Sequence, residues 1–494
     1  MSRDLVIGID LGTTACKVLA VGCDGVVHGV ASCEYPLHTP SAGHAEQDAH
    51  EVLAGVRSAM TQLLKIVDRD DVAGISFSGA MHGLMPVDEA GEPLARSITW
   101  ADLRAVQQFD DIRSSDVAES LYNQTGCPLR WLYYPAKLRW MQANEPELFD
   151  RTARFVAIKD WIIHKLTGQW VTDICIASGT GLLNLHSQNW HPEALKLAEI
   201  YEHQLPTLAP PHQIIGHLTA NGADILGLPA GLPVIPGGGD GGMANIGAGG
   251  ALPGSVVVTV GTSGAVRITC DQPLLDPQQR IWCYVLTKNL WYAGGAINNG
   301  GQAVETIRRL FFGDAQKSQG FDALFEAAAQ VHAGADGVML LPYFNGERNP
   351  HWRPDLRASL LGLTSSHDRS HVARAVLEAV AFCLADVWQV VRSSSSSAQP
   401  KAVRLTGGIT RSRLWSQIVC DVLNLPVTLS EAGDASAMGA AAVGHWGLGH
   451  VDGLEAFPMD EQERITLTPD AKKHAIYSEK HALFQREVSH VLSR

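Results

Sequence analysis

The sequence of 494 residues lacks the features of several large protein classes. Its nine cysteines include no CxxC pair, and their odd number leaves no complete set of disulfides, so we expect reduced thiols. No stretch clusters lysine and arginine, and the formal net charge of -13 offers no attraction to nucleic acid or to an anionic membrane. Neither is therefore an expected partner.

Long apolar runs are also missing. The N-terminal MSRDLVIGIDLG has an apolar run that ends at Asp10, which is too short for a signal peptide. The least charged region, from Gly231 to Val266, is interrupted by glycine and proline clusters that a lipid-exposed helix would not tolerate. We therefore expect no transmembrane span and a cytoplasmic location.

The composition that is present favours a globular α/β protein of two or more domains, because 46% of residues are hydrophobic and 18% charged over a length that exceeds one core. Apolar strand patterns alternate with helical ones after residue 40. A glycine- and proline-rich stretch between Leu228 and Pro253 divides the chain almost equally. We predict a boundary near its end, with domains over 1–248 and 249–494.

Each half opens with the same pattern. VIGIDLGTTACKVLAV near the N-terminus and SVVVTVGTSGAVRIT after the glycine-rich stretch both read as an apolar strand, a turn with glycine and hydroxyl residues, and a second strand that carries a basic residue. Two such patterns at the starts of two similar halves indicate a duplicated architecture.

The first of these turns gathers groups that suit a phosphate chain. Gly12, Thr13 and Thr14 place backbone N–H groups and two hydroxyls together, with Lys17 nearby and Asp10 just before them. Phosphate oxygens need hydrogen-bond donors, and the accompanying Mg²⁺ needs a carboxylate. The spacing is not that of a Walker A loop, and the alternative is a simple hairpin turn.

The second turn supplies similar donors without an acidic residue, from Gly261, Thr262 and Ser263. Two such turns facing each other would hold a triphosphate from both sides. For this turn too, a purely structural role is the alternative.

Asp240 stands among six glycines in the segment PGGGDGGMANIG, after the apolar run LPVI. With so little side-chain crowding, its carboxylate can approach a substrate hydroxyl and accept the proton as that oxygen attacks phosphorus. The alternative is an aspartate in an ordinary Asp-Gly turn. We predict that Asp240 is the catalytic base.

Two segments combine an apolar platform with hydrogen-bonding groups, as a polyol pocket requires. SFSGAMHGLM contributes Met81 and His82, and ITWADLRA contributes Trp100 and Asp102. A core position is the alternative for either segment. Arg104 either binds a substrate carboxylate or pairs internally with an acidic neighbour.

Near the C-terminus, AVRLTGGITRSRLW reads as a strand, a glycine turn and the start of a helix. Gly407 and Gly408 would let an adenine ring lie against bare backbone, with Ser412 near the ribose. Gly300 and Gly301, ahead of a helical pattern, are candidates for the border of the same pocket.

Taken in this order, the segments resemble the FGGY family of carbohydrate kinases over nearly the whole chain. The most specific part runs from Ala358 to Glu378, which meets the C-terminal signature of that family. The other signature, around Tyr134–Trp140, is met only in part, since Pro135 is displaced by one place and Ala143 replaces a polar residue. The resemblance implies two actin-like (ribonuclease H-like) α/β ATPase lobes with a cleft between them.

The resemblance also implies an ATP-dependent phosphotransferase that uses Mg²⁺. It implies that Asp240 is the general base and that Met81, His82 and Trp100 contact the substrate. Asp10 and Asp240 are then expected to hold the metal. The contacts implied for the phosphates are Thr13, Thr14, Lys17, Thr262 and Ser263, and those implied for adenosine are Gly301, Gly407, Gly408 and Ser412.

Within the family, TWADLRA, TGCPL, GTSGAVR and NGERNPHW look closest to gluconokinases, with xylulokinases next. We expect transfer of the γ-phosphoryl group of ATP to a hydroxyl of a sugar or sugar acid, with gluconate first and D-xylulose as the alternative. Two other classes stay open: a sugar-binding sensor that has lost transfer, and an actin-fold ATPase that acts on protein partners. A homodimer is also left open.

Overall fold

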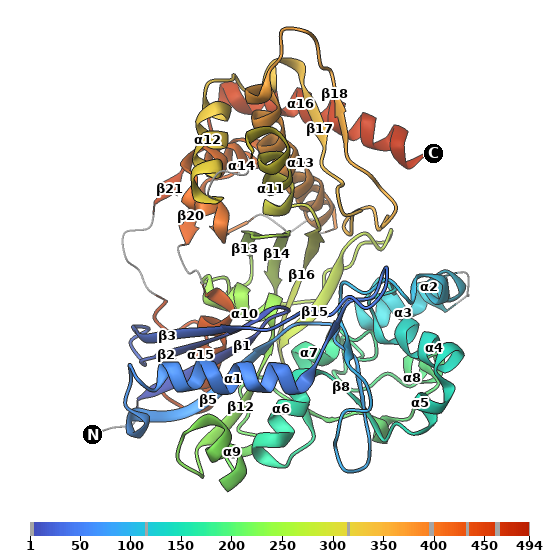
Figure 1. Cartoon of the computed structure of the whole chain (residues 1–494), viewed down its shortest axis with the longest axis vertical. Coiled ribbons are helices and arrows are strands. Elements are labelled where there is room, and N and C mark those ends of the chain that lie inside the picture. Colours follow the sequence, from blue (N-terminus) through green and yellow to red (C-terminus); the bar gives the residue numbers. More distant parts are fainter. Residues whose placement is uncertain are drawn as a thin grey trace.

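The computed structural model describes residues 4–113, 117–313, 317–394, 400–430, 434–459 and 465–493. The chain forms two lobes, each built on one large sheet (Figure 1). The first sheet has six strands in the order β11-β12-β5-β1-β2-β3. These strands are β1 (Leu5–Leu11), β2 (Ala15–Val21), β3 (Val27–Glu34), β5 (Val72–Gly79), β11 (Gly216–His217) and β12 (Pro233–Gly239).

The second sheet has seven strands in the order β15-β16-β14-β13-β19-β20-β21. They are β13 (Ser255–Val260), β14 (Gly264–Cys270), β15 (Trp282–Thr287), β16 (Leu290–Ile297), β19 (Ala402–Thr406), β20 (Val427–Ser430) and β21 (Thr466–Leu467). Short strands also pair as β4 (Glu46–Gln47) with β7 (Ser97–Ile98), β6 (Met85–Val87) with β8 (Arg154–Val156), β9 (Val171–Asp173) with β10 (Thr207–Ala209), and β17 (Met339–Leu341) with β18 (Ser359–Leu361).

The centres of the two large sheets share one topology. In the first sheet, β1, β2 and β3 pair antiparallel, and β5 and β12 continue from β1 as parallel strands. In the second, β13, β14 and β16 pair antiparallel, and β19 and β20 continue from β13 as parallel strands. The predicted duplication is therefore confirmed, and each half opens with the predicted strand–turn–strand unit.

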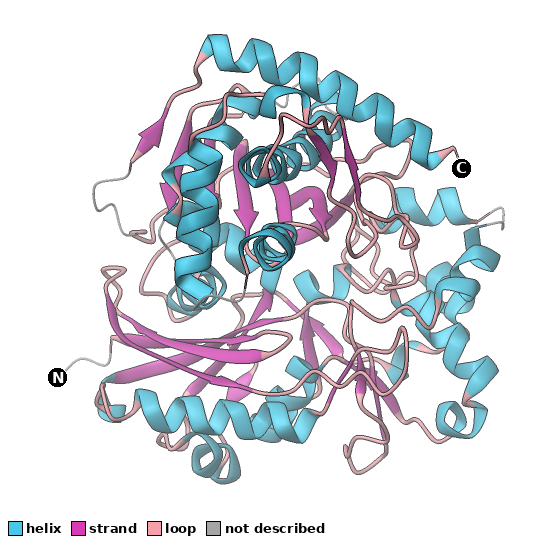
Figure 2. Cartoon of the chain, turned by 45° about the horizontal axis from the view of Figure 1, so that its top comes forward, coloured by secondary structure: helices cyan, strands magenta, loops and turns pink. Residues whose placement is uncertain are grey.

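Helices cover the sheets (Figure 2). Helix α1 (Ala49–Leu63) packs on β2 and β3, while α13 (Arg369–Ser393) packs on β14 and β16 and contacts α11 (Gly301–Phe312) and α14 (Arg413–Leu423). The other helices are α2 (Val106–Arg113), α3 (Ala118–Thr125), α4 (Tyr134–Asn144), α5 (Pro146–Asp150), α6 (Ile158–Thr167), α7 (Ile174–Ser178), α8 (Pro192–Ala198), α9 (Ala220–Leu226), α10 (Asp240–Gly247), α12 (Lys317–Ala329), α15 (Ala435–Gly447) and α16 (Ala471–Leu492).

Local sequence explains the first of these elements. Successive residues of β1 point to opposite faces of the sheet. Ile7 and Ile9 therefore enter the core beneath α1, whereas Val6 enters the larger core on the other face. Asp48 caps the N-terminus of α1, since its carboxylate accepts from the backbone N–H of His50 at 2.9 Å.

Two helices cross between the sheets with their backbones in contact. A Cβ on Gly439 of α15 would lie 1.9 Å from the carbonyl oxygen of Met243 in α10, and a Cβ on Gly247 of α10 would meet α15 equally closely. A Cβ on Gly8 of β1 would lie 2.0 Å from the carbonyl oxygen of Ala437. Only glycine permits these approaches. Helix α15, red in Figure 1, therefore lies on the first sheet although it comes late in the chain.

The last strand of the first sheet ends at Gly239, α10 ends at Gly247, and the second sheet begins at Ser255. We therefore propose that the lobes comprise 1–248 and 249–494, with α15 packed on the opposite lobe. Within the described ranges, no helix is both long enough and apolar enough to cross a membrane.

The close crossing predicts a cost for one methyl group. In the Gly439→Ala variant the new carbon would lie 1.9 Å from a carbonyl oxygen. Overpacking of this kind costs about 1–3 kcal/mol or more, which exceeds the gain of about 1 kcal/mol in helix propensity. We expect differential scanning fluorimetry to show a Tm several degrees lower. An unchanged Tm would contradict the backbone contact.

Candidate active site

A cavity of about 310 Å³ lies between the two sheets and gathers many of the predicted residues. Its lining includes seven of them: Thr13, Met81, His82, Trp100, Asp240, Gly261 and Ser263. The remaining lining residues are Gly241, Thr259, Gly264, Ala265, Arg267, Trp282, Tyr284, Tyr292, Ala296 and Arg348. The cavity thus has parts of both predicted phosphate turns, one carboxylate, two arginines and an aromatic wall. The aromatic wall consists of Trp282, Tyr284 and Tyr292.

Asp240 lies where β12 passes into α10 and is the first residue of that helix. The strand reaches this point by a close approach to β5, since Gly237 has a φ of 63° and a Cβ there would lie 1.7 Å from the carbonyl oxygen of Phe77. The backbone N–H of Gly241 donates to Asp240 Oδ1 at 2.7 Å. Burial raises the pKa of Asp240, and the nearby Arg267 opposes that rise. A carboxylate of raised pKa facing a cavity suits a general base.

A second carboxylate is near Asp240. Asp10, in β1, accepts a hydrogen bond from Ser78 Oγ at 2.7 Å. Burial raises the pKa of Asp10 to about 7, and the negative charge of Asp240 adds to that rise. Two partly buried carboxylates, one of which raises the proton affinity of the other, form a site that a cation would stabilise.

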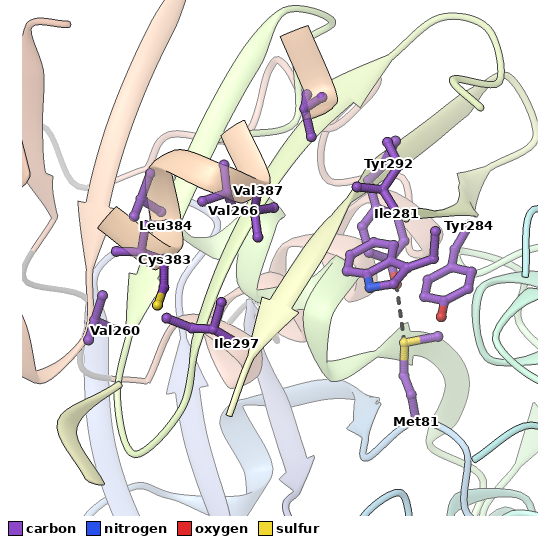
Figure 3. Packing of buried hydrophobic residues seen from close by; sticks show 14 of the residues in the cluster. Met81, Val260, Val266, Ile281, Tyr284, Tyr292, Ile297, Cys383, Leu384 and Val387 are labelled. Carbon is purple, nitrogen blue, oxygen red and sulfur yellow. Dashed lines mark hydrogen bonds between the residues drawn. The ribbon is translucent and has the colours of Figure 1, made fainter. Parts of the chain in front are cut away.

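His82 and Met81 form one wall of the cavity. His82 has a φ of 66°, which is strained for a residue with a side chain, and its Nδ1 donates to the carbonyl oxygen of Gly179 at 2.7 Å. Burial lowers the pKa of His82 to about 3, so the ring is neutral and its Nε2 is an acceptor. Met81 accepts a hydrogen bond from Tyr292 at 3.2 Å, and Figure 3 shows these two side chains pointing toward each other.

Trp100 links the two lobes across the cavity. Its Nε1 donates to Thr13 Oγ1 in the first turn at 3.1 Å. The guanidinium of Arg348, from the second half of the chain, lies 4.6 Å from the centre of the Trp100 ring. Arg348 is also held by Asn298, since its Nε donates to the side-chain oxygen of Asn298 at 2.7 Å. These contacts fix the orientation of the guanidinium.

Lys137 supports this wall from behind. Its Nζ donates to the carbonyl oxygens of His82 at 2.5 Å, Ile98 at 3.1 Å and Thr99 at 2.9 Å. The side chain is fully buried, and burial lowers its pKa to about 7. Lys137 therefore ties the loop that carries His82 to the loop that carries Trp100. The sequence pattern identified Lys137 only as part of an incomplete signature.

The rest of the first predicted phosphate turn lies beside the cavity. The carbonyl oxygen of Gly12 accepts from Tyr35 at 2.7 Å, and Thr14 is exposed. Lys17 Nζ does not line the cavity but pairs with Asp434, just before α15, at 2.7 Å. This ion pair joins the first hairpin to the helix that crosses between the sheets.

Several of the predicted adenosine residues surround the second turn. The backbone N–H of Gly301 donates to the carbonyl oxygen of Gly261 at 2.7 Å, and the N–H of Gln302 donates to the carbonyl oxygen of the exposed Thr262 at 2.9 Å. A Cβ on Gly407 would lie 2.5 Å from the carbonyl oxygen of Val260, which requires glycine, and Gly408 follows at the surface.

Ser412 has a different environment from these glycines. Its side chain caps α14 by accepting from the backbone N–H of Trp415 at 3.3 Å, and the residue is only 8% exposed. The structure thus gives Ser412 a capping contact, and its contact with ribose stays a prediction.

The structure does not bring Asp102 to the cavity. Its Oδ2 accepts from the backbone N–H of Ala45 at 2.7 Å and from Arg104 at 2.8 Å, and the residue is 1% exposed. Arg104 also donates to Glu46 at 2.5 Å. Of the two interpretations of Arg104, the described contacts are those of the internal ion pair. The charges of Asp102 and Arg104 are therefore paired within this network.

Sequence reasoning missed Arg267, Arg348 and the aromatic wall. Arg267 is the basic residue of the second strand–turn–strand unit. A charged residue in an otherwise apolar strand could have identified it as a candidate site residue. Arg348 lies within NGERNPHW, which no secondary-structure pattern places near the first lobe. Tyr284 and Tyr292 follow the apolar alternation of β15 and β16, so only the fold distinguishes them from core residues.

A cavity between two actin-like lobes, with a partly buried carboxylate beside turns that suit phosphate, defines the class of small-molecule kinases. Comparison with known proteins agrees. Residues 5–247 match the N-terminal domain model of the FGGY family of carbohydrate kinases, and residues 256–448 match its C-terminal domain model. The chain therefore belongs to the FGGY family and is an ATP-dependent phosphotransferase with an alcohol acceptor.

Individual relatives span nearly the whole chain. It is 34% identical to a gluconokinase of Bacillus subtilis, covering 91% of this chain and 89% of the relative. The crystal structure of gluconate kinase from Lactobacillus acidophilus matches with a TM-score of 0.93 and 31% identity, covering 99% and 98% of the two chains. The structure of ligand-bound xylulose kinase from the same organism matches with a TM-score of 0.92, also at 31% identity, with the same coverage.

The lowered pKa of His82 predicts a pH effect on stability. An unfolded histidine binds a proton near pH 6.5, whereas the folded His82 does not until about pH 3. The stability that this residue contributes is therefore present above pH 6.5 and is lost as the pH falls. In His82→Gln, the decrease in stability from pH 7 to pH 5 should be smaller by up to about 2 kcal/mol. Urea unfolding at both pH values measures this, and equal decreases in both proteins would contradict it.

Proposed function

We propose that the protein transfers the γ-phosphoryl group of ATP to a hydroxyl group of gluconate. The observation that carries the kinase chemistry is the position of Asp240 in a cavity that Thr13 of the first turn and Gly261 and Ser263 of the second turn also line. The choice of gluconate rests on the gluconokinase-like segments of the sequence and on the gluconokinase relative at 34% identity. D-xylulose is the second candidate, supported by the equally similar xylulose kinase structure.

In this proposal, Asp240 accepts the proton of the attacking hydroxyl. The two turns donate hydrogen bonds to the phosphate chain, and Gly301, Gly407 and Gly408 border the adenosine beside the second turn. Met81, His82 and Trp100 hold the sugar on the side of the first lobe. Closure of the lobes excludes water, so that positioning and electrostatics supply most of the acceleration.

Magnesium fits this carboxylate pair. The described part of the chain contains no cluster of three or more His, Cys, Asp or Glu side chains arranged for a metal. Mg²⁺ in kinases usually takes one or two carboxylates and completes its shell with water and phosphate oxygens. We propose that Asp10 and Asp240 supply these carboxylates. When bound, the ion would offset negative charge on the phosphates.

Location and assembly remain proposals of the same kind. A cytoplasmic protein with reduced thiols fits the nine free cysteines. The homodimer, which the sequence leaves open, stays a prediction.

The Asp240→Asn variant tests the catalytic assignment. Loss of the base should lower kcat by about 10²–10⁴-fold, while ATP affinity changes little because the phosphate turns remain. Stability should not fall, because burial disfavours the charged form of Asp240. The measurements are ADP release in a coupled assay and ATP binding by calorimetry.

Asp102→Asn is a matched control, because it changes a buried aspartate outside the cavity lining. This control variant should lower the Tm of the protein but should have little effect on kcat. A near-normal kcat for Asp240→Asn would refute the role of Asp240 as the base.

A substrate panel tests the acceptor. Gluconate, D-xylulose, L-ribulose, L-fuculose and glycerol are compared by kcat/KM with ATP, and products are identified by mass spectrometry. We expect the highest kcat/KM with gluconate. A higher value with D-xylulose would favour a xylulokinase, and binding without phosphorylated product would favour a sensor. ATP hydrolysis that needs no acceptor would favour an ATPase that acts on protein partners.

A further inference from the structure

Arg267 has a buried donor without a partner. It lies on β14, and its side chain lines the cavity. Its Nη1 donates to Thr259 Oγ1 at 3.2 Å, whereas its Nε is buried and has no hydrogen-bond partner among the described residues. Buried polar atoms are rarely left unpaired, and a buried charged group without a partner is especially costly. A ligand in the cavity would supply the missing acceptor.

The backbone of Arg267 lies away from the phosphate turn, although its guanidinium reaches back to Thr259 of β13. It follows Gly264, at the end of that turn, by three residues along an extended strand, so its backbone lies about 10 Å farther along the strand. A Cβ on Gly241 would lie 3.4 Å from Arg267 Nε, which places the guanidinium against the start of α10. Arg267 thus faces the part of the cavity between Asp240 and the aromatic wall.

The charges of the cavity favour an anion at this point. Asp10 and Asp240 would both repel an acidic substrate, so such a substrate requires a fixed cation in the same cavity. Arg267 meets this requirement, since an arginine stays protonated even when burial lowers its pKa. Its planar group donates two parallel hydrogen bonds to a carboxylate, which no neutral sugar can match.

Arg348, the other cationic residue of the lining, is placed differently. Its guanidinium stacks on Trp100, which is itself bonded to Thr13 of the first phosphate turn. Its Nε is already bonded to Asn298. Arg348 is therefore held by Trp100 and Asn298, whereas the buried Nε of Arg267 has no acceptor among the described residues.

We infer that Arg267 binds the carboxylate of a sugar-acid substrate and thereby sets the preference of this kinase for aldonates over neutral sugars. The inference rests on the proposed function, because it assumes that the acceptor is an acid such as gluconate. It assigns to one residue a specificity that the fold alone does not determine.

The test compares Arg267→Met with Arg267→Lys. Loss of a buried charge partner costs about 2–5 kcal/mol, so gluconate kcat/KM should fall at least about 30-fold in Arg267→Met. The loss should lie mainly in the KM and the calorimetric Kd for gluconate, with the KM for ATP nearly unchanged. Arg267→Lys should restore part of the gluconate affinity, because it keeps the charge and loses the planar donor pair. The ratio of gluconate to D-xylulose turnover should fall in Arg267→Met.

Arg404→Met is the matched control, since Arg404 lies on β19 of the same sheet outside the cavity lining. It should keep the wild-type ratio of gluconate to D-xylulose turnover. Melting temperatures of all variants show whether a loss comes from unfolding.

Four outcomes would overturn the inference. A higher KM for ATP with an unchanged KM for gluconate would mean that Arg267 serves the transferred phosphoryl group. A change of preference in Arg348→Met but not in Arg267→Met would assign the carboxylate to Arg348. A wild-type protein that does not bind gluconate would refute the proposed function as well, whereas normal gluconate kinetics in Arg267→Met would refute only the role of Arg267.

Discussion

The backbone contact between α10 and α15 determines where the chemistry of this protein can occur. Because Gly439 and Gly247 have no side chains, the two helices can approach closely. A carbonyl oxygen of the facing helix then lies where the Cβ atom of any other residue would be. Because α15 also packs on β1 and β5, this contact fixes α10 relative to the first sheet. Asp240, at the start of α10, is therefore held between the two lobes. Substitutions at Gly439 or Gly247 should therefore shift the position of the Asp240 carboxylate.

The second constraint is electrostatic. The charge of Asp240 acts on the nearby Asp10, although burial disfavours the charged form of both, and Arg267 and Arg348 line the same cavity as Asp240. In a low dielectric these charges act more strongly on one another than they would in water. Opposed charges of this kind allow a base with a raised pKa, a cation site and an anion site to share one small volume. A kinase for an acidic sugar needs all three.

Much of the fold was predictable because its signals are local. The strand–turn–strand units, the long helix α13 and the glycine-rich passage before Asp240 follow from period, turn residues and composition. Asp240, His82, Met81 and Trp100, which line the cavity, could be singled out for the same reason, since each lies in a short segment of unusual composition. Family models then matched both halves of the chain.

What could not be predicted depends on contacts between distant segments. Asp102 looked like a pocket residue, but Arg104 lies two positions away and pairs with it, together with Glu46. Lys137 supports the pocket through three backbone carbonyls, a role that no spacing rule reveals. Arg267 and Arg348 reach one cavity from segments about 80 residues apart. Only the packed structure brings such side chains together.

A crystal structure of the protein with gluconate and a non-hydrolysable ATP analogue tests the central claim most directly. The account predicts the acceptor hydroxyl within about 2.6–3.2 Å of the Asp240 carboxylate, with the terminal phosphate between the two turns and the substrate carboxylate at Arg267. A substrate bound away from Asp240, or a triphosphate that does not reach Thr13 and Ser263, would contradict it.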